Sequence, residues 1–119
     1  MSTSYQTIEG KGQTGISRTL AAAPPILVAQ EQALLELLSA ARGVSIIGVD
    51  TESNSLYAYY HQVCLIQISL PGRDYVVDPL TVDVKPLGTL FANPACEKIF
   101  HAAENDILGL KRDYEFTFT

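Results

Sequence analysis

The sequence predicts an α/β domain with a mixed β-sheet and helices packed on it. Three apolar runs rich in β-branched residues lie at 44–49, 63–70 and 74–77, and such runs are typical of strands. Short connections favour antiparallel pairing of these runs, because a parallel pair needs a crossover of about a dozen residues or more. A fourth run, Lys98–Phe100, follows a candidate helix, so we expect it to lie parallel to its partner strand.

Three further segments have the spacing of helices. Leucines recur at helical spacing within 31–42, and Gly43 follows where a helix C-terminus favours glycine. Residues 86–91 form a shorter candidate, whose proline is tolerated in the first turn. From Ala103 to Tyr114, apolar side chains again share one helical face. These helices are expected to cover the sheet.

The first 25 residues differ in composition from the rest. They are rich in Gly, Ser and Thr and end in a proline pair, so we expect a flexible leader at 1–25 and a folded domain at 26–119. Residues 10–15 spell G-x-G-x-x-G. That motif binds dinucleotides only between a strand and a helix, and neither is expected here.

Composition excludes several classes of function. The 119 residues contain 8 Lys+Arg and 13 Asp+Glu, a formal charge of −5, so the chain lacks the positive field of proteins that coat nucleic acid by charge alone. No apolar stretch approaches the roughly 20 residues that cross a bilayer, and the N-terminus lacks a signal-peptide core. We expect a cytoplasmic protein with no membrane partner. Cys64 and Cys96 form no CxxC pair and suggest buried free thiols.

The candidate chemistry begins at Asp50-Thr51-Glu52, where the first long apolar strand ends. Side chains two apart on a strand project from the same face, so the two carboxylates lie together. Adjacent carboxylates repel each other, and a bound divalent cation relieves that repulsion. Hard oxygen ligands favour Mg²⁺ or Mn²⁺. The competing interpretation is a strand that ends in ordinary polar residues before a turn.

Asp106 is the candidate partner of this pair, because it lies near the start of the helix that follows the fourth strand. If that strand is parallel to the Asp50 strand, all three carboxylates lie at the carboxyl ends of adjacent strands, where open α/β sheets bind ligands. Alternatively, Asp106 only complements the positive N-terminal end of its helix.

Four segments in this order carry a resemblance to a known family: Asp50-Thr51-Glu52, YYHQVCLIQIS at 59–69, DYVVDPL at 74–80 and KIFHAAENDILGL at 98–110. Residues 26–119 resemble the N-terminal part of ribonuclease D-like 3'-5' exonucleases of the DEDD superfamily. The resemblance implies a ribonuclease H-like fold, with three antiparallel strands plus a parallel fourth. It also implies hydrolysis of phosphodiester bonds from the 3' end of RNA or single-stranded DNA.

The same resemblance implies the site residues. Two divalent metal ions, Mg²⁺ or Mn²⁺, would be held by Asp50, Glu52 and Asp106, which are also the expected catalytic residues. Asp50 would bridge both ions, Glu52 would hold one ion, and Asp106 would reach the other. The implied contacts to the 3' end of the nucleic acid come from Thr51, His101 and Asn105.

Two departures from the family pattern qualify these expectations. Ser53 stands where the family often has Phe, and the family's third motif, a Tyr and an Asp on a later helix, has no counterpart before Thr119. We therefore expect a fold truncated at its C-terminus and little or no activity from these 119 residues alone. The alternatives are a non-catalytic module that binds nucleic acid or protein with a degenerate exonuclease fold, or completion in trans, for example in a homo-oligomer.

Overall fold

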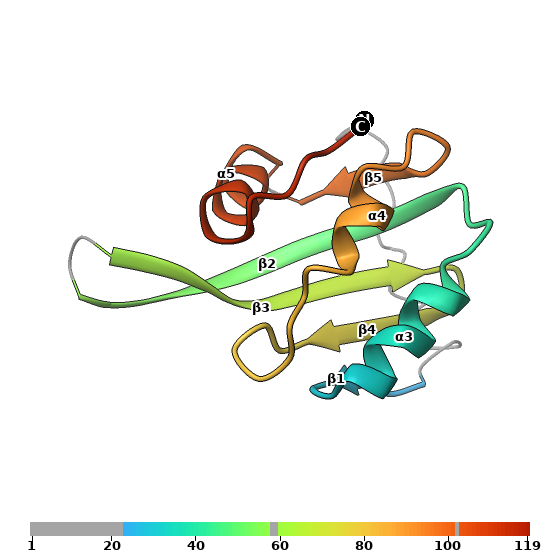
Figure 1. Ribbon diagram of the computed structural model, residues 1–119, viewed down its shortest axis with the longest axis horizontal. Helices are drawn as coiled ribbons and strands as arrows, with labels where there is room; N and C mark the ends of the chain where they lie inside the picture. Colours follow the sequence, from blue (N-terminus) through green and yellow to red (C-terminus); the bar gives the residue numbers. More distant parts are fainter. Residues whose placement is uncertain (1–22, 58–59, 102) are drawn as a thin grey trace.

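The protein folds around a five-stranded mixed sheet with the strand order β1-β4-β3-β2-β5 (Figure 1). The computed structural model describes residues 23–57, 60–101 and 103–119, so most of the expected leader lies outside the described residues. The strands are β1 (Ile26–Val28), β2 (Ile46–Tyr57), β3 (Tyr60–Leu70), β4 (Arg73–Val77) and β5 (Glu97–Phe100). The helices are α3 (Glu31–Ala40), α4 (Leu87–Phe91) and α5 (Ala103–Tyr114).

Strands β2, β3 and β4 pair antiparallel in sequence order, which confirms the predicted meander. The β2–β3 hairpin is much longer than the apolar pattern indicates, because pairing continues through Ser53↔Val63 to Tyr57↔Tyr60. The polar stretch expected to be a link is therefore largely strand. Main-chain hydrogen bonds hold a hairpin together whatever its side chains, so this extension leaves no trace in the apolar periodicity.

The two outer strands pair parallel to their neighbours. β5 pairs with β2 in a register that runs from Ile46↔Glu97 to Val49↔Phe100, as the sequence predicts for a strand reached through a helix. At the other edge β1 pairs with β4, with Leu27 opposite Val76. This fifth strand is not among the predicted ones, since three residues are too few to show a period.

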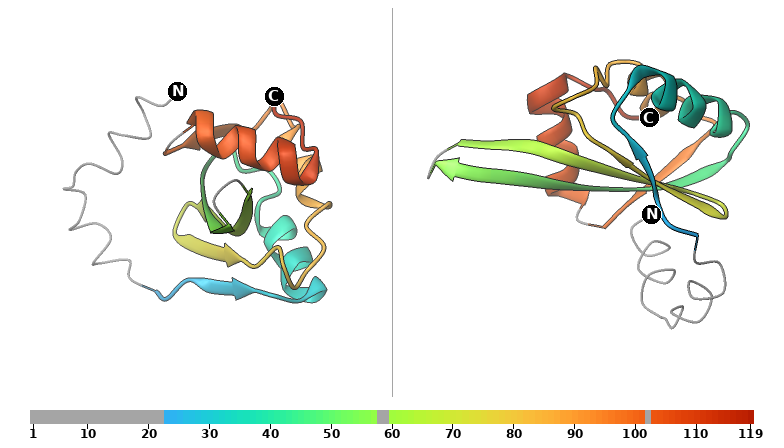
Figure 2. Two further views of the ribbon diagram at one scale, coloured as in Figure 1. Left: turned by 90° about the vertical axis from the view of Figure 1, so that its left-hand side faces the viewer. Right: turned by 90° about the horizontal axis from the view of Figure 1, so that it is seen from below.

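The helices agree closely with their predicted ranges. α3 ends at Ala40, two residues before the predicted end, and Gly43 then turns the chain with φ 80°, in the left-handed region that glycine adopts without strain. α3 and α4 lie over the same face of the sheet (Figure 2, right), whereas α5 packs against β3 and β5. None of the helices among the described residues is both long and apolar enough to span a bilayer.

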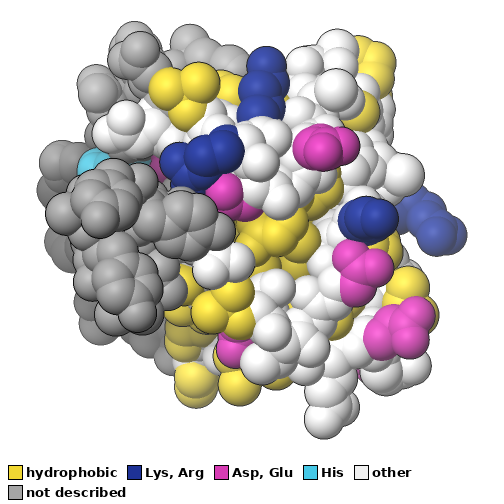
Figure 3. Space-filling view, turned by 60° about the vertical axis from the view of Figure 1, so that its left-hand side comes forward, with side chains coloured by type: hydrophobic (Ala, Val, Ile, Leu, Met, Phe, Trp, Pro, Cys, Tyr) yellow, Lys and Arg dark blue, Asp and Glu magenta, His cyan; other side chains and the backbone are white. Residues whose placement is uncertain are grey.

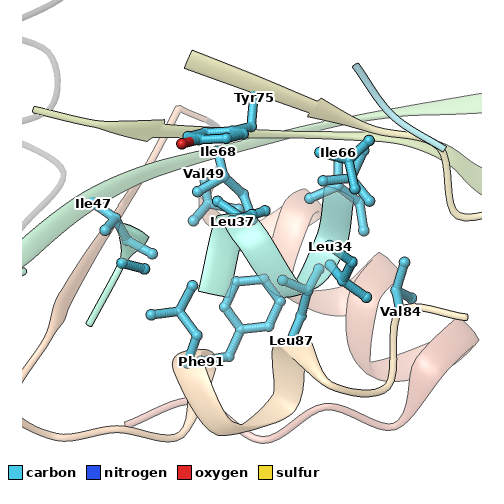
Figure 4. Close-up of a cluster of buried hydrophobic side chains, with 14 of the residues drawn as sticks. Leu34, Leu37, Ile47, Val49, Ile66, Ile68, Tyr75, Val84, Leu87 and Phe91 are labelled. Carbon is cyan, nitrogen blue, oxygen red and sulfur yellow. The ribbon is translucent and has the colours of Figure 1, made fainter. Parts of the chain in front are cut away.

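The hydrophobic core lies between the sheet and helices α3 and α4 (Figure 4). Side chains from both layers are buried there, among them Leu34, Leu37, Ile47, Val49, Ile66, Ile68, Tyr75, Val84, Leu87 and Phe91. Along β2 the buried residues alternate with less buried ones, so one face of this strand belongs to the core. Cys64 and Cys96 are free thiols, half-buried and buried respectively.

Residues 115–119 run back over the helical layer after α5 ends. Glu115 has φ 58°, a left-handed conformation that commonly follows a helix C-terminus. Phe116 and Phe118 then pack their rings against Phe91, with centroids 5.1 and 5.0 Å away. The Thr119 amide donates to the Phe91 carbonyl oxygen at 3.1 Å. The segment therefore closes the core beside α4.

Candidate active site

The acidic pair lies where β2 leaves its parallel partner. Register pairing between β2 and β5 ends at Val49↔Phe100, so Asp50 and His101 are the next residues on the two strands. On its other side Asp50 pairs with Gln67 of β3. Asp50 is half-buried and Glu52 is exposed. The predicted parallel placement of β5 beside β2 is confirmed. The expected end of the strand at Asp50 is wrong, because β2 continues beside β3 to Tyr57 and only its pairing with β5 stops before the acidic pair.

Thr51 connects the acidic pair to helix α5. Its hydroxyl donates a hydrogen bond to Asp106 Oδ1 at 2.6 Å, and its backbone N–H donates to Asp50 Oδ1 at 2.9 Å. Asp106 is only 3% exposed. If Asp106 only complemented the N-terminal end of α5, a contact with a residue 55 positions away in the sequence would not be expected. Asp106 therefore lies against the acidic segment of β2.

The three carboxylates do not form a compact cluster. Strand alternation directs Asp50 and Glu52 to one face of β2 and Thr51 to the other, and Asp106 approaches from the Thr51 side. Across residues 23–57, 60–101 and 103–119, no group of three His, Cys, Asp or Glu side chains is placed to hold a metal. The assignment of Asp50, Glu52 and Asp106 as metal ligands and catalytic residues stays a prediction.

The donor chemistry of the acidic pair nevertheless fits a hard divalent cation. Mg²⁺ typically keeps several waters and binds through one or two carboxylates together with substrate phosphates. Asp50 and Glu52 supply two carboxylates from one face of one strand. These two carboxylates are therefore enough to bind one such cation without a third protein ligand.

A second set of contacts attaches the far end of α5 to β3. The Val63 amide donates to Asp113 Oδ2 at 2.7 Å, and the Tyr114 hydroxyl donates to the Val63 carbonyl oxygen at 3.2 Å. Val63 takes this place because a bulge shifts the register of β3 at Cys64, between the pairs Glu52↔Leu65 and Ser53↔Val63. These contacts were not predicted, since nothing in the linear sequence marks which residue a bulge exposes to a helix.

Close packing and charge reinforce that attachment. A Cβ at Gly109 would lie 3.0 Å from Val63 Cγ2, so the glycine lets α5 approach the strand. Burial raises the pKa of the Asp113 carboxyl, but hydrogen bonds from Arg112 and the Val63 amide outweigh it and leave the pKa below its usual range. Burial, with the Asp113 charge beside it, raises the pKa of Tyr114. Asp113 is therefore held as the anion that accepts from Val63.

The two remaining predicted contacts lie at the surface of the site. His101 follows β5 directly and Asn105 precedes Asp106 on α5, and both are exposed. Figure 3 shows one face of the molecule, on which Lys and Arg side chains are interspersed with Asp and Glu. On that face the described residues form no broad basic patch, in keeping with the net charge of −5.

Comparison with known proteins identifies the family. A family model described as 3'-5' exonuclease matches residues 25–118. The chain belongs to the 3'-5' exonuclease family. Exonucleases of this family use divalent metal ions. The match covers every described strand and helix together with both acidic segments of the site.

Individual relatives agree with this assignment. The exosome complex exonuclease RRP6 of Saccharomyces cerevisiae is 40% identical over 91 residues, which are 75% of this chain and 12% of that protein. Ribonuclease D of Acidiphilium cryptum is 35% identical over 85 residues, covering 70% of this chain and 22% of the relative. The chain thus spans less than a quarter of the length of either relative.

The fold of this exonuclease-family chain matches that of a solved relative. The crystal structure of Escherichia coli RNase D, described as an exoribonuclease involved in structured RNA processing, superposes with a TM-score of 0.71 at 28% identity. The superposition covers 78% of this chain and 25% of the bacterial one. The mixed sheet with flanking helices is therefore the ribonuclease D-type exonuclease fold, as the sequence resemblance implied.

Proposed function

We propose that this chain forms the metal-binding part of a ribonuclease D-type active site that hydrolyses phosphodiester bonds from the 3' end of single-stranded RNA. One observation carries the proposal: Asp50 and Glu52 follow the last residues of β2 that pair with β5, and Thr51 between them donates a hydrogen bond to Asp106 near the start of α5. Family membership indicates which reaction this arrangement would serve, the removal of nucleotides from a 3' end. RNA is favoured over DNA by the described activity of the E. coli relative.

The residues divide the work according to their positions. Asp50 and Glu52 would hold the first ion, and Asp106 would contribute to the second from α5. When bound, two divalent ions supply an activated water and stabilise the leaving oxygen of the phosphodiester. His101 and Asn105 are exposed beside the carboxylates, where they would contact the terminal nucleotide and hold its phosphate near the acidic pair.

Mn²⁺ titration followed by electron paramagnetic resonance tests the acidic pair directly. The wild-type chain is expected to bind Mn²⁺, and Asp50→Asn or Glu52→Gln is expected to weaken binding by more than about tenfold, because loss of a direct ligand should exceed the effect of losing a partner of a ligand. Glu36→Gln on α3 is the matched control, since Glu36 is exposed and bonded to Gln32 on the same helix. Equal Mn²⁺ affinity in all four proteins would contradict the proposed site.

A further inference from the structure

We propose that Thr51 is a positioning residue whose hydroxyl holds the Asp106 carboxylate in place against the acidic segment of β2. The inference rests on the proposed function, because it assigns how that metal site is built. It replaces the expected contact between Thr51 and substrate. The Thr51 hydroxyl donates its proton to Asp106 Oδ1, and the proposal assigns it that role in place of donation to a nucleotide.

The hydrogen-bond geometry favours a positioning role. At 2.6 Å, the Thr51 hydroxyl to Asp106 contact has the short length of a hydrogen bond from O–H to an ionised carboxylate, which is stronger than one between neutral groups. The Thr51 backbone N–H orients Asp50 in the same way. One residue therefore fixes two carboxylates that belong to different elements.

Burial makes the orientation of Asp106 sensitive to this bond. With 3% of its surface exposed, Asp106 has little access to water, and a buried carboxylate must be hydrogen-bonded by the protein. Removal of the Thr51 hydroxyl would leave Oδ1 without that donor. The carboxylate would then turn toward other donors and change its place relative to Asp50.

Helix α5 is held at both ends, which limits other ways to place Asp106. Its N-terminal part is joined to β2 through Thr51, and its C-terminal part is joined to β3 through Asp113 and Val63. Seven residues of helix from Asp106 to Asp113 rise about 10 Å. The two anchors on the hairpin are Thr51 and Val63. They are separated by two residues along the strand direction, about 7 Å, and by one interstrand spacing, about 5 Å. The two anchors on the hairpin are thus about 9 Å apart, close enough to the helical rise of about 10 Å for both contacts to form together.

Two substitutions at Thr51 separate the hydroxyl from the shape of the side chain. Thr51→Val keeps the branched shape and removes the donor, whereas Thr51→Ser keeps the donor and removes a methyl group. In the Mn²⁺ titration, Thr51→Val is expected to bind about tenfold more weakly than wild type, in the range seen when a partner of a metal ligand is lost. Thr51→Ser is expected to stay within about twofold of wild type by the same reasoning.

Thermal unfolding of each variant is measured alongside, without metal. If Thr51 had a purely structural role, Thr51→Val would lower the stability of the fold but leave its Mn²⁺ affinity at the level of Thr51→Ser. Wild-type affinity in a folded Thr51→Val overturns the inference and leaves the proposed function standing. If Thr51→Val does not fold, a tenfold loss in Thr51→Ser overturns it instead. If the wild-type chain binds no Mn²⁺, or binds it as tightly as Asp50→Asn does, the proposed function is overturned and the inference with it.

Discussion

Replacing Phe91 with alanine is expected to lower the free energy of unfolding by about 4 kcal/mol, within the usual range for a buried phenylalanine. Its side chain is fully buried. The Phe116 ring packs edge-on against it, and the Phe118 ring packs against it at a tilt. Phe118 also contacts Phe100 of β5, with centroids 5.6 Å apart. Loss of the Phe91 ring would therefore leave a cavity where α4, β5 and the C-terminal segment meet.

Equilibrium urea unfolding, followed by circular dichroism, measures this loss. Leu35→Ala is the control, because Leu35 lies on α3 with 49% of its surface exposed, and a change within about 0.5 kcal/mol is expected for such a surface position. If Phe91→Ala costs no more than the control, the aromatic cluster does not anchor residues 115–119.

Replacing Lys98 with methionine is expected to destabilise the fold by about 3 kcal/mol. Lys98 is 2% exposed, and its ammonium donates to the carbonyl oxygens of Asn93, Cys96 and Thr119, the last two at 2.6 and 2.7 Å. Burial lowers the pKa of Lys98, partly opposed by the Cys96 thiol beside it. Methionine fills the space but donates no hydrogen bond. The contact with Cys96 is buried and those with Asn93 and Thr119 are partly buried, and a hydrogen bond to a charged group contributes about 1.5–3 kcal/mol.

Lys85→Met is the matched substitution for this measurement, since Lys85 is exposed. The same unfolding experiment should show a small change for Lys85→Met and a large one for Lys98→Met. Equal stability of the two variants would mean that relief from burying a charge offsets the lost hydrogen bonds, and that Lys98 does not hold the C-terminal segment.

The sequence predicts most of the fold, because strands β2 to β5 contain apolar runs and the three helices have helical spacing of apolar residues. The parts it misses have a physical reason. β1 is three residues long and gains its identity only by pairing with β4. The hairpin from Ser53 onward is held by main-chain pairing, so its polar side chains give no strand signal. Lys98 shows in the sequence only as a charge beside an apolar run. Two of its carbonyl partners, Asn93 and Cys96, lie in the turn just before it, and tertiary structure brings the third, Thr119.

The candidate site is predictable in its position and less so in its geometry. The parallel placement of β5, and with it the acidic pair just beyond the paired residues of β2, follows from the pattern of strands and helices. The approach of Asp106 to Thr51 does not, because it depends on how α5 is attached to Val63 at a bulge. A register shift of this kind is set by tertiary packing, which a single sequence does not display.

Binding of a 5'-labelled single-stranded RNA, followed by fluorescence anisotropy in Mn²⁺ and in EDTA, tests the central claim most directly. The account predicts binding that requires Mn²⁺, is lost in Asp50→Asn and weakens when the RNA carries a 3'-phosphate, because the site holds the 3' end through metal and carboxylates. The contradicting result is binding in EDTA that falls with salt and is unchanged in Asp50→Asn, since charge alone produces such behaviour. That result would make the chain a non-catalytic nucleic-acid-binding module.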